Sequence, residues 1–202
     1  MNHNDEPTVV TVHDDGTMDG HNGVYNKHLS DMRGVYSDEA ALEAAIAADG
    51  ADALAYRVEE NRVGSGDGAL IFGTSTLLPR RIGDEYTVTR GHLHSKPGCA
   101  EVYHCLSGHG LMLLDSLDGQ WRALEMHPGD VVHVPGYWVH RSVNVGVDTF
   151  VTAFTYDEDA GQNYDLIDQS GGMSHLIVAD GDGGWRAIPN PRHIGYGALA
   201  AA

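Results

Sequence analysis

Short runs in which apolar and polar side chains alternate fill most of the chain after its first quarter. Successive side chains of a strand point to opposite faces, so this alternation predicts strands with one buried face. Turn sequences such as SGHG, HPGD and DGDGG separate the runs. The predicted strands are residues 53–60, 69–78, 85–94, 100–108, 110–116, 121–126, 130–135, 138–145, 149–156, 174–180 and 185–189. Short strands at regular spacing are typical of an all-β barrel or sandwich.

One clear helix signal precedes the strands. Ser37 is a candidate cap, Asp38 and Glu39 follow in the first turn, and an alanine-rich segment ends at Gly50. Residues 163–169 predict a second, short helix. The predicted organisation is an N-terminal arm at 1–30, a single domain at 31–190 and a C-terminal tail at 191–202.

Composition narrows the classes of function. The 202 residues include 29 acidic and 12 basic side chains, which give a net charge of −17 and argue against nucleic acid and anionic membranes as partners. No apolar run is long enough to cross a bilayer, and the acidic N-terminus does not have the order of a signal peptide. With only Cys99 and Cys105, a disulfide framework is not expected. We therefore predict a cytoplasmic protein.

Two histidines spaced two apart are the strongest chemical signal. His92 and His94 lie in the run predicted as a strand over 85–94, so both imidazoles point to one face. Glu101 begins the next predicted strand, and an antiparallel return can bring it opposite the pair. His140, on a later strand, can add a fourth ligand. Three imidazoles and one carboxylate suit Fe, Mn, Ni, Zn or Co and leave positions open for a substrate.

The sequence around these ligands resembles the two motifs of the cupin superfamily. The first is a glycine, His-x-His, a glutamate and a second glycine; the second is Pro-Gly-Asp followed by a proline and a histidine. The matching residues are Gly91, His92, His94, Glu101, Gly108, Pro128, Gly129, Asp130, Pro135 and His140. The resemblance implies an all-β cupin (jelly-roll) β-barrel with the metal inside it, an N-terminal arm and one or two short helices.

Within that superfamily, the chain resembles the cupin-type glucose-6-phosphate isomerases of archaea and some bacteria. The resemblance is carried by LSDM at 29–32, MHPGDVVHVPGYWVHRSVNVG at 126–146 and DEDAGQNYDLI at 157–167. It implies reversible conversion of glucose 6-phosphate to fructose 6-phosphate by a homodimer. It also implies one divalent metal per chain (Fe, Mn, Ni or Zn), held by the four ligands.

The same resemblance implies a set of side chains around the sugar phosphate. These are Tyr56, Ser75, Thr89, Gly91, Tyr103, Tyr137, Tyr156 and Tyr164. At one position the chain departs from the family, because Gln162 stands where a histidine is common. Glutamine can hydrogen-bond but does not titrate near neutral pH, so Gln162 is expected to contact the substrate without shuttling a proton.

Aldose–ketose isomerisation needs a base near C1 and C2 and stabilisation of the enediolate charge. Glu101 is the candidate base, and a metal can act as the Lewis acid. A metal-assisted hydride shift between the two carbons is an open alternative. Tyr103 shares strand parity with Glu101, so it is expected in the same cavity, either orienting Glu101 or a sugar hydroxyl or packing as a core aromatic.

Two other classes of function fit the same ligand set. Cupins with three histidines and one glutamate include dioxygenases and oxalate-degrading enzymes, and a third class binds sugars without turnover. The hydroxyls of Ser75, Thr89 and Tyr156 favour a phosphosugar. Because the net charge of −17 repels a dianion, we expect its binding to depend on local donors and the metal.

Overall fold

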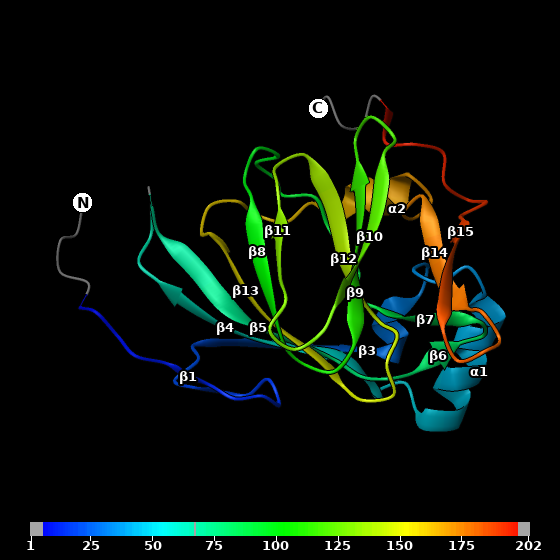
Figure 1. Cartoon of the computed structure of the whole chain (residues 1–202), viewed down its shortest axis with the longest axis horizontal. Helices are drawn as coiled ribbons and strands as arrows, with labels where there is room; N and C mark the ends of the chain where they lie inside the picture. Colours follow the sequence, from blue (N-terminus) through cyan, green and yellow to red (C-terminus); the bar gives the residue numbers. More distant parts are fainter. Residues whose placement is uncertain (1–5, 67, 198–202) are drawn as a thin grey trace.

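The computed structural model describes residues 6–66 and 68–197, which form two large antiparallel sheets enclosing a core (Figure 1). The strands of the six-stranded sheet are β3 (Gly23–His28), β4 (Leu54–Val63), β5 (Leu70–Leu77), β8 (Glu101–Ser107), β11 (Val131–Val134) and β13 (Phe150–Asp157). They lie in the order β11-β8-β13-β5-β4-β3. The chain therefore crosses repeatedly between sheets, and the predicted all-β barrel is confirmed.

The second sheet has seven strands. They are β6 (Arg81–Ile82), β7 (Glu85–Val88), β9 (Gly110–Ser116), β10 (Trp121–Met126), β12 (Trp138–Asn144), β14 (His175–Ala179) and β15 (Trp185–Pro189). Their order is β10-β9-β12-β7-β14-β15, with β6 paired to β7. Every residue of β9 is buried, because one face lines the barrel and C-terminal residues contact the other. There the Asp115 carboxylate accepts hydrogen bonds from the Ser174 amide and from the hydroxyl of Tyr196, which lies in the predicted tail.

The helices follow the prediction except at one cap. Helix α1 (Glu39–Asp49) is preceded by Asp38, whose side chain accepts a hydrogen bond from the Ala41 amide at 2.8 Å. Asp38, and not Ser37, is therefore the N-cap; the Ser37 hydroxyl instead donates to Glu85 on β7. A 3₁₀ turn, η1 (Leu29–Met32), precedes α1, and α2 (Asp165–Gln169) lies within the predicted second helix.

The predicted N-terminal arm is partly a component of the barrel. Strand β3 pairs with β4 over six residue pairs, so the sheet begins at Gly23 and not at residue 31. The segment GVYNKH has only Val24 and Tyr25 as large apolar residues, and hydrogen bonding to β4 compensates for its weak hydrophobic pattern. Before it, a small hairpin of β1 (Thr11–Val12) and β2 (Met18–Asp19) lies against β4, where Glu59 accepts a hydrogen bond from the Met18 amide. Residues 1–5 of the predicted arm and 198–202 of the tail lie outside the described residues.

The strand predicted over 85–94 ends early. Regular pairing stops at Val88, and Gly91 adopts a left-handed φ of 75°. The chain beyond it is held by isolated bridges, His92 to His140 and Leu93 to Asn163. In the described part of the chain, no helix has the length and apolar character needed to cross a membrane.

Candidate metal centre and active site

Four buried side chains converge inside the barrel. His92 and His94 come from the segment after β7, Glu101 is the first residue of β8, and His140 lies on β12. Their Nε2 atoms surround one carboxylate oxygen, Oε2 of Glu101, at 3.6 Å for His92, 3.1 Å for His94 and 3.0 Å for His140. The structure thus brings together the four side chains predicted as metal ligands.

The donor set fits a divalent transition ion. Ligand atoms about 2.1 Å from a metal and at right angles to one another lie about 3 Å apart, which matches the distances around Glu101. Nδ1 of His140 is 3.0 Å from the Trp138 carbonyl oxygen, an arrangement that places the proton on Nδ1 and leaves the Nε2 lone pair for a metal. Within the described residues, buried Nε2 of His92 has no hydrogen-bond partner, as expected for an atom reserved for a ligand.

Electrostatics keep these groups in the protonation state that a metal requires. Burial would raise the pKa of Glu101, but the three facing histidines outweigh it and hold that pKa well below its ordinary value. Burial, together with the neighbouring His140, lowers the pKa of His92 to about 4. At neutral pH Glu101 is therefore ionised and His92 is neutral, which are the forms that bind metals.

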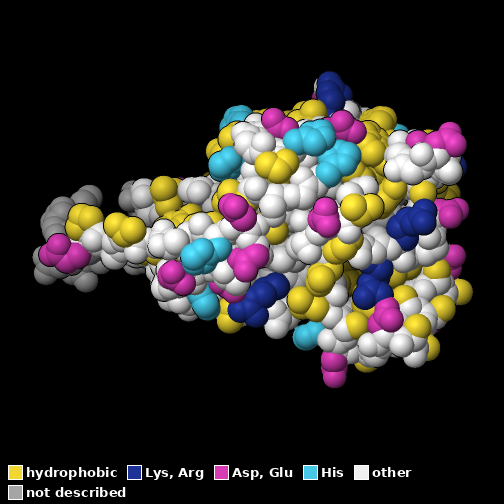
Figure 2. All heavy atoms as spheres, turned by 60° about the horizontal axis from the view of Figure 1, so that its bottom comes forward, with side chains coloured by type: hydrophobic (Ala, Val, Ile, Leu, Met, Phe, Trp, Pro, Cys, Tyr) yellow, Lys and Arg dark blue, Asp and Glu magenta, His cyan; other side chains and the backbone are white. Residues whose placement is uncertain are grey.

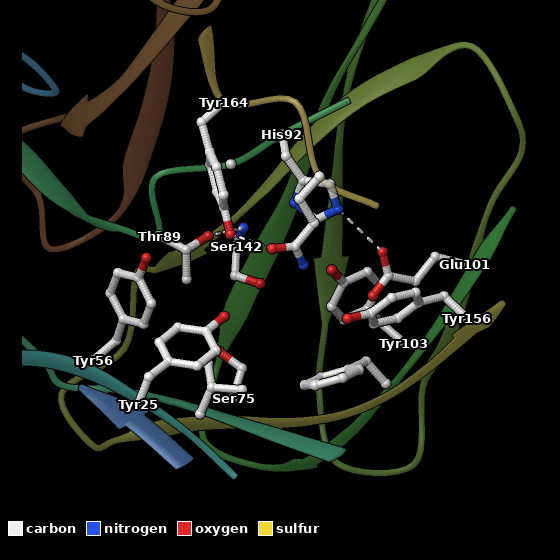
Figure 3. Close-up of a pocket in the computed structure, with 14 residues that line it drawn as sticks. Tyr25, Tyr56, Ser75, Thr89, His92, Glu101, Tyr103, Ser142, Tyr156 and Tyr164 are labelled. Carbon is white, nitrogen blue, oxygen red and sulfur yellow. Dashed lines mark hydrogen bonds and ion pairs between the residues drawn. The ribbon is translucent and has the colours of Figure 1, made fainter. Parts of the chain in front are cut away.

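A cavity opens beside the cluster, and most of the predicted substrate contacts line it (Figure 3). The predicted residues in its wall are Tyr56, Ser75, Thr89, Gly91, Tyr103, Tyr156, Gln162 and Tyr164, together with His92 and Glu101. The hydroxyl of Tyr164 donates to the side-chain oxygen of Gln162. Burial and the charge of Glu101 raise the pKa of Tyr103 well above its ordinary value, so its hydroxyl keeps its proton.

Two further polar residues line the cavity and are absent from the prediction. Ser142 lies two residues after His140 on β12, so strand parity could have identified it. Tyr25 lies on β3, inside the segment predicted as an arm, and nothing in the local sequence distinguishes it. Its position follows only from the pairing of β3 with β4.

Tyr137 is the one predicted contact that the structure does not bring into the cavity. The side chain of Tyr137 is 60% exposed, and its hydroxyl group lies beside Gly98. Tyr137 is the only non-glycine residue with positive φ (68°) among the described residues, in the turn between β11 and β12. Tyr137 lies three residues before His140, and an odd separation along a strand places the two side chains on opposite faces, which agrees with the exposure of Tyr137.

Gly91 allows the backbone to pass close to β12 beside the ligands. A Cβ there would lie 2.8 Å from both the His140 carbonyl oxygen and the Arg141 Cβ, in addition to the left-handed φ. We expect Gly91→Ala to lower the free energy of unfolding by roughly 1–3 kcal/mol from backbone strain alone, and more through the clash. Denaturant unfolding measures the change. Gly119→Ala is the control, because that glycine has φ of 91° but nothing within 4 Å; equal losses for both variants would contradict the clash.

The barrel with three histidines and a glutamate converging inside it defines the chain as a cupin. The chain belongs to the glucose-6-phosphate isomerase (GPI) family, whose model matches residues 26–193.

Individual proteins similar to this chain are also glucose-6-phosphate isomerases. The chain is 45% identical over 175 residues to a glucose-6-phosphate isomerase of Sinorhizobium medicae (strain WSM419), covering 87% of this chain and 81% of the relative. It is 38% identical over 177 residues to the glucose-6-phosphate isomerase of Thermococcus gammatolerans. That match covers 88% of this chain and 90% of the relative. Among solved structures, an oxalate oxidase is similar at a TM-score of 0.47 and 17% identity over 56% of each chain.

Proposed function

We propose that this protein catalyses the reversible isomerisation of glucose 6-phosphate and fructose 6-phosphate with a divalent metal held by His92, His94, Glu101 and His140. The observation that supports this most is the combination of the convergent His and Glu side chains with an adjoining cavity lined by hydroxyl groups, in a chain of this family. The enzyme class is that of an aldose–ketose isomerase.

Glu101 is the proposed base. All three histidine contacts use its Oε2, so Oε1 takes no part in them. Because the carboxylate is ionised at neutral pH and lines the cavity, it can accept a proton from C2 of the aldose and return it to C1, while the hydroxyl proton of O2 passes to O1 to complete the ketose. A divalent ion bound at the four ligands would supply Lewis-acid stabilisation of the charge that develops on the sugar oxygens. Tyr103, which keeps its proton, would donate a hydrogen bond to a sugar oxygen.

The phosphate group is proposed to lie at the other side of the cavity. Figure 3 shows several hydroxyl groups gathered there, away from Glu101; they belong to Tyr25, Tyr56, Ser75, Thr89 and Ser142. No lysine or arginine is among the described residues that line this cavity. Acidic side chains are scattered over the molecular face shown in Figure 2. Neutral donors close to the phosphate would therefore bind it despite the unfavourable net charge.

A coupled assay tests the proposed function and its metal dependence. Fructose 6-phosphate is supplied, glucose 6-phosphate is detected with a dehydrogenase, and the protein is assayed before and after EDTA treatment. We expect turnover that disappears on chelation and returns with Mn²⁺ or Fe²⁺. No turnover with any added divalent metal would refute the proposal, and oxygen uptake without isomerisation would favour the dioxygenase alternative.

A homodimer and a cytoplasmic location are part of the proposal. Val131 on the edge strand β11 is 60% exposed and Val102 on neighbouring β8 is 40% exposed, which is apolar surface that a second copy could cover. Cys99 and Cys105 are free thiols, as suits a reducing compartment. Light scattering is expected to give twice the chain mass of 21.7 kDa.

A further inference from the structure

A second group of metal-ligating side chains lies at the rim of the barrel. His109 immediately precedes β9, Glu125 lies near the end of β10, and His127 directly follows that strand. The β9–β10 ladder ends with Gly110 opposite Met126, so the next position along the hairpin sets His109 opposite His127. Glu125 lies two residues before His127 and therefore on the same face. The topology of the hairpin thus places three potential ligands on one patch.

The three side chains are already close. One potential ligand atom from each lies within 4.8 Å of the others. The imidazole rings of His109 and His127 stack with centroids 4.5 Å apart and an interplanar angle of 15°. Nε2 of His109 is 3.9 Å from Oε1 of Glu125, is shielded from solvent, and has no hydrogen-bond partner within the described ranges. A shielded nitrogen without a partner is costly unless a ligand occupies it.

Two neighbouring groups orient the candidate ligands. The indole Nε1 of Trp185 on β15 donates to Oε1 of Glu125 at 2.7 Å. Oδ2 of Asp130 accepts a hydrogen bond from the His127 backbone amide at 2.8 Å and lies 3.7 Å from Nδ1 of the same residue. A hydrogen bond to a ligating carboxylate, such as the one from Trp185 to Glu125, is a supporting contact found around metal sites in proteins.

We propose that His109, Glu125 and His127 bind a second divalent transition ion, of the Zn²⁺ or Ni²⁺ class, with water completing its coordination. Two imidazoles and one carboxylate suit such ions. Small rotations of the side chains are needed to bring the donors from their present separations to one ion. Two of the three residues are exposed, so their side chains have room for these rotations.

This rim site is separate from the metal centre in the cavity. Glu101 begins β8, whereas His109 follows the other end of that strand, roughly 20 Å away at 3.3 Å per residue. An ion at the rim would join the turn between β8 and β9 to the turn between β10 and β11. Both turns carry the chain from one sheet to the other. The proposed ion would therefore cross-link β9 and β10 where their ladder ends, and it is expected to stabilise the barrel at this rim.

The ion content of the holoprotein tests this inference. The full chain, already loaded at the cavity site, is dialysed against micromolar free Zn²⁺ and its metal-to-protein ratio is measured. We expect one additional ion per chain in the wild type and in His133→Gln, whose histidine is exposed on β11 and outside the group. His109→Gln and His127→Gln should each lose that ion and keep the first. An unchanged ratio in either variant, or no additional ion in the wild type, would overturn the proposal.

Stability and fluorescence provide readouts that do not depend on turnover. Zn²⁺ added to the loaded wild type should raise Tm by roughly 5 °C, and it should not raise Tm in His127→Gln. Ni²⁺ should quench the fluorescence of Trp185, whose indole contacts Glu125, and His109→Gln should remove that quenching. Equal responses of the variants and the wild type would show that the ion binds elsewhere. Because these measurements omit the sugar phosphate, they do not depend on the proposed isomerase activity.

Discussion

Glutamine in place of Glu101 is expected to lower kcat by roughly 10²–10⁴-fold, the usual contribution of a positioned base. The amide has nearly the shape of the carboxylate but cannot accept a proton from the sugar carbon. Three histidines remain to hold the metal, so the comparison is made per bound ion, with metal content measured on the same samples. Glu158→Gln, in the turn after β13, is a control that removes an acidic side chain outside the cavity.

The isotope content of the product separates the two possible routes. In D₂O, a proton moved by Glu101 exchanges with solvent, and deuterium enters the sugar at C1 or C2. A hydride shift between the carbons would carry the original hydrogen across without exchange. If Glu101→Gln keeps its metal and nearly full turnover, Glu101 is not the base, and a product free of deuterium from the wild type would support the hydride route.

Alanine in place of His140 is expected to lower both the stability of the protein and its affinity for the metal, because this histidine is both a proposed ligand and a buried partner of Glu101. Its Nε2 lies 3.0 Å from the Glu101 carboxylate, and its side chain is 1% exposed. Removing it would leave a buried carboxylate short of one partner. We expect the free energy of unfolding of the metal-free protein to fall by about 2–4 kcal/mol.

The same substitution should also weaken metal binding by more than about 100-fold, since loss of a direct ligand exceeds the effect of losing a supporting contact. Turnover should fall in parallel with metal content. His104→Ala is the matched control, because His104 lies on β8 with Glu101 but faces solvent. A His140→Ala protein that retains its metal and its activity would remove His140 from the proposed site.

Much of the metal centre could be predicted because its determinants are local. The spacing of His92 and His94 places both imidazoles on one side of an extended segment, and the structure brings them to Glu101 and His140 although regular pairing ends at Val88. Extended backbone preserves this alternation even where the sheet ladder is interrupted. Apart from the run predicted over 85–94, which ends at Val88, the predicted runs match observed strands to within a few residues, since burial of one face requires alternation.

The substrate cavity depended more on contacts between distant segments. Tyr25 reaches the wall because β3 hydrogen-bonds to β4, and these bonds are independent of side-chain identity, so the segment carries little hydrophobic pattern. Tyr137 lies in a turn with a left-handed φ, and its odd separation from His140 favours the face opposite to the cavity. Ser142 could have been inferred from the inward direction of His140.

By itself, the sequence determined the all-β class, the strand runs, the four candidate ligands and the family, because alternation and motif spacing are properties of short segments. Only the tertiary structure decided that the predicted arm contributes a strand and a tyrosine to the cavity, that Tyr137 lies outside it, and that His109 and His127 face each other at the rim. These arrangements depend on strand register and turn geometry. Both are set by hydrogen bonds between residues that are far apart in the chain or by single backbone dihedrals, neither of which leaves a periodic signal in the sequence.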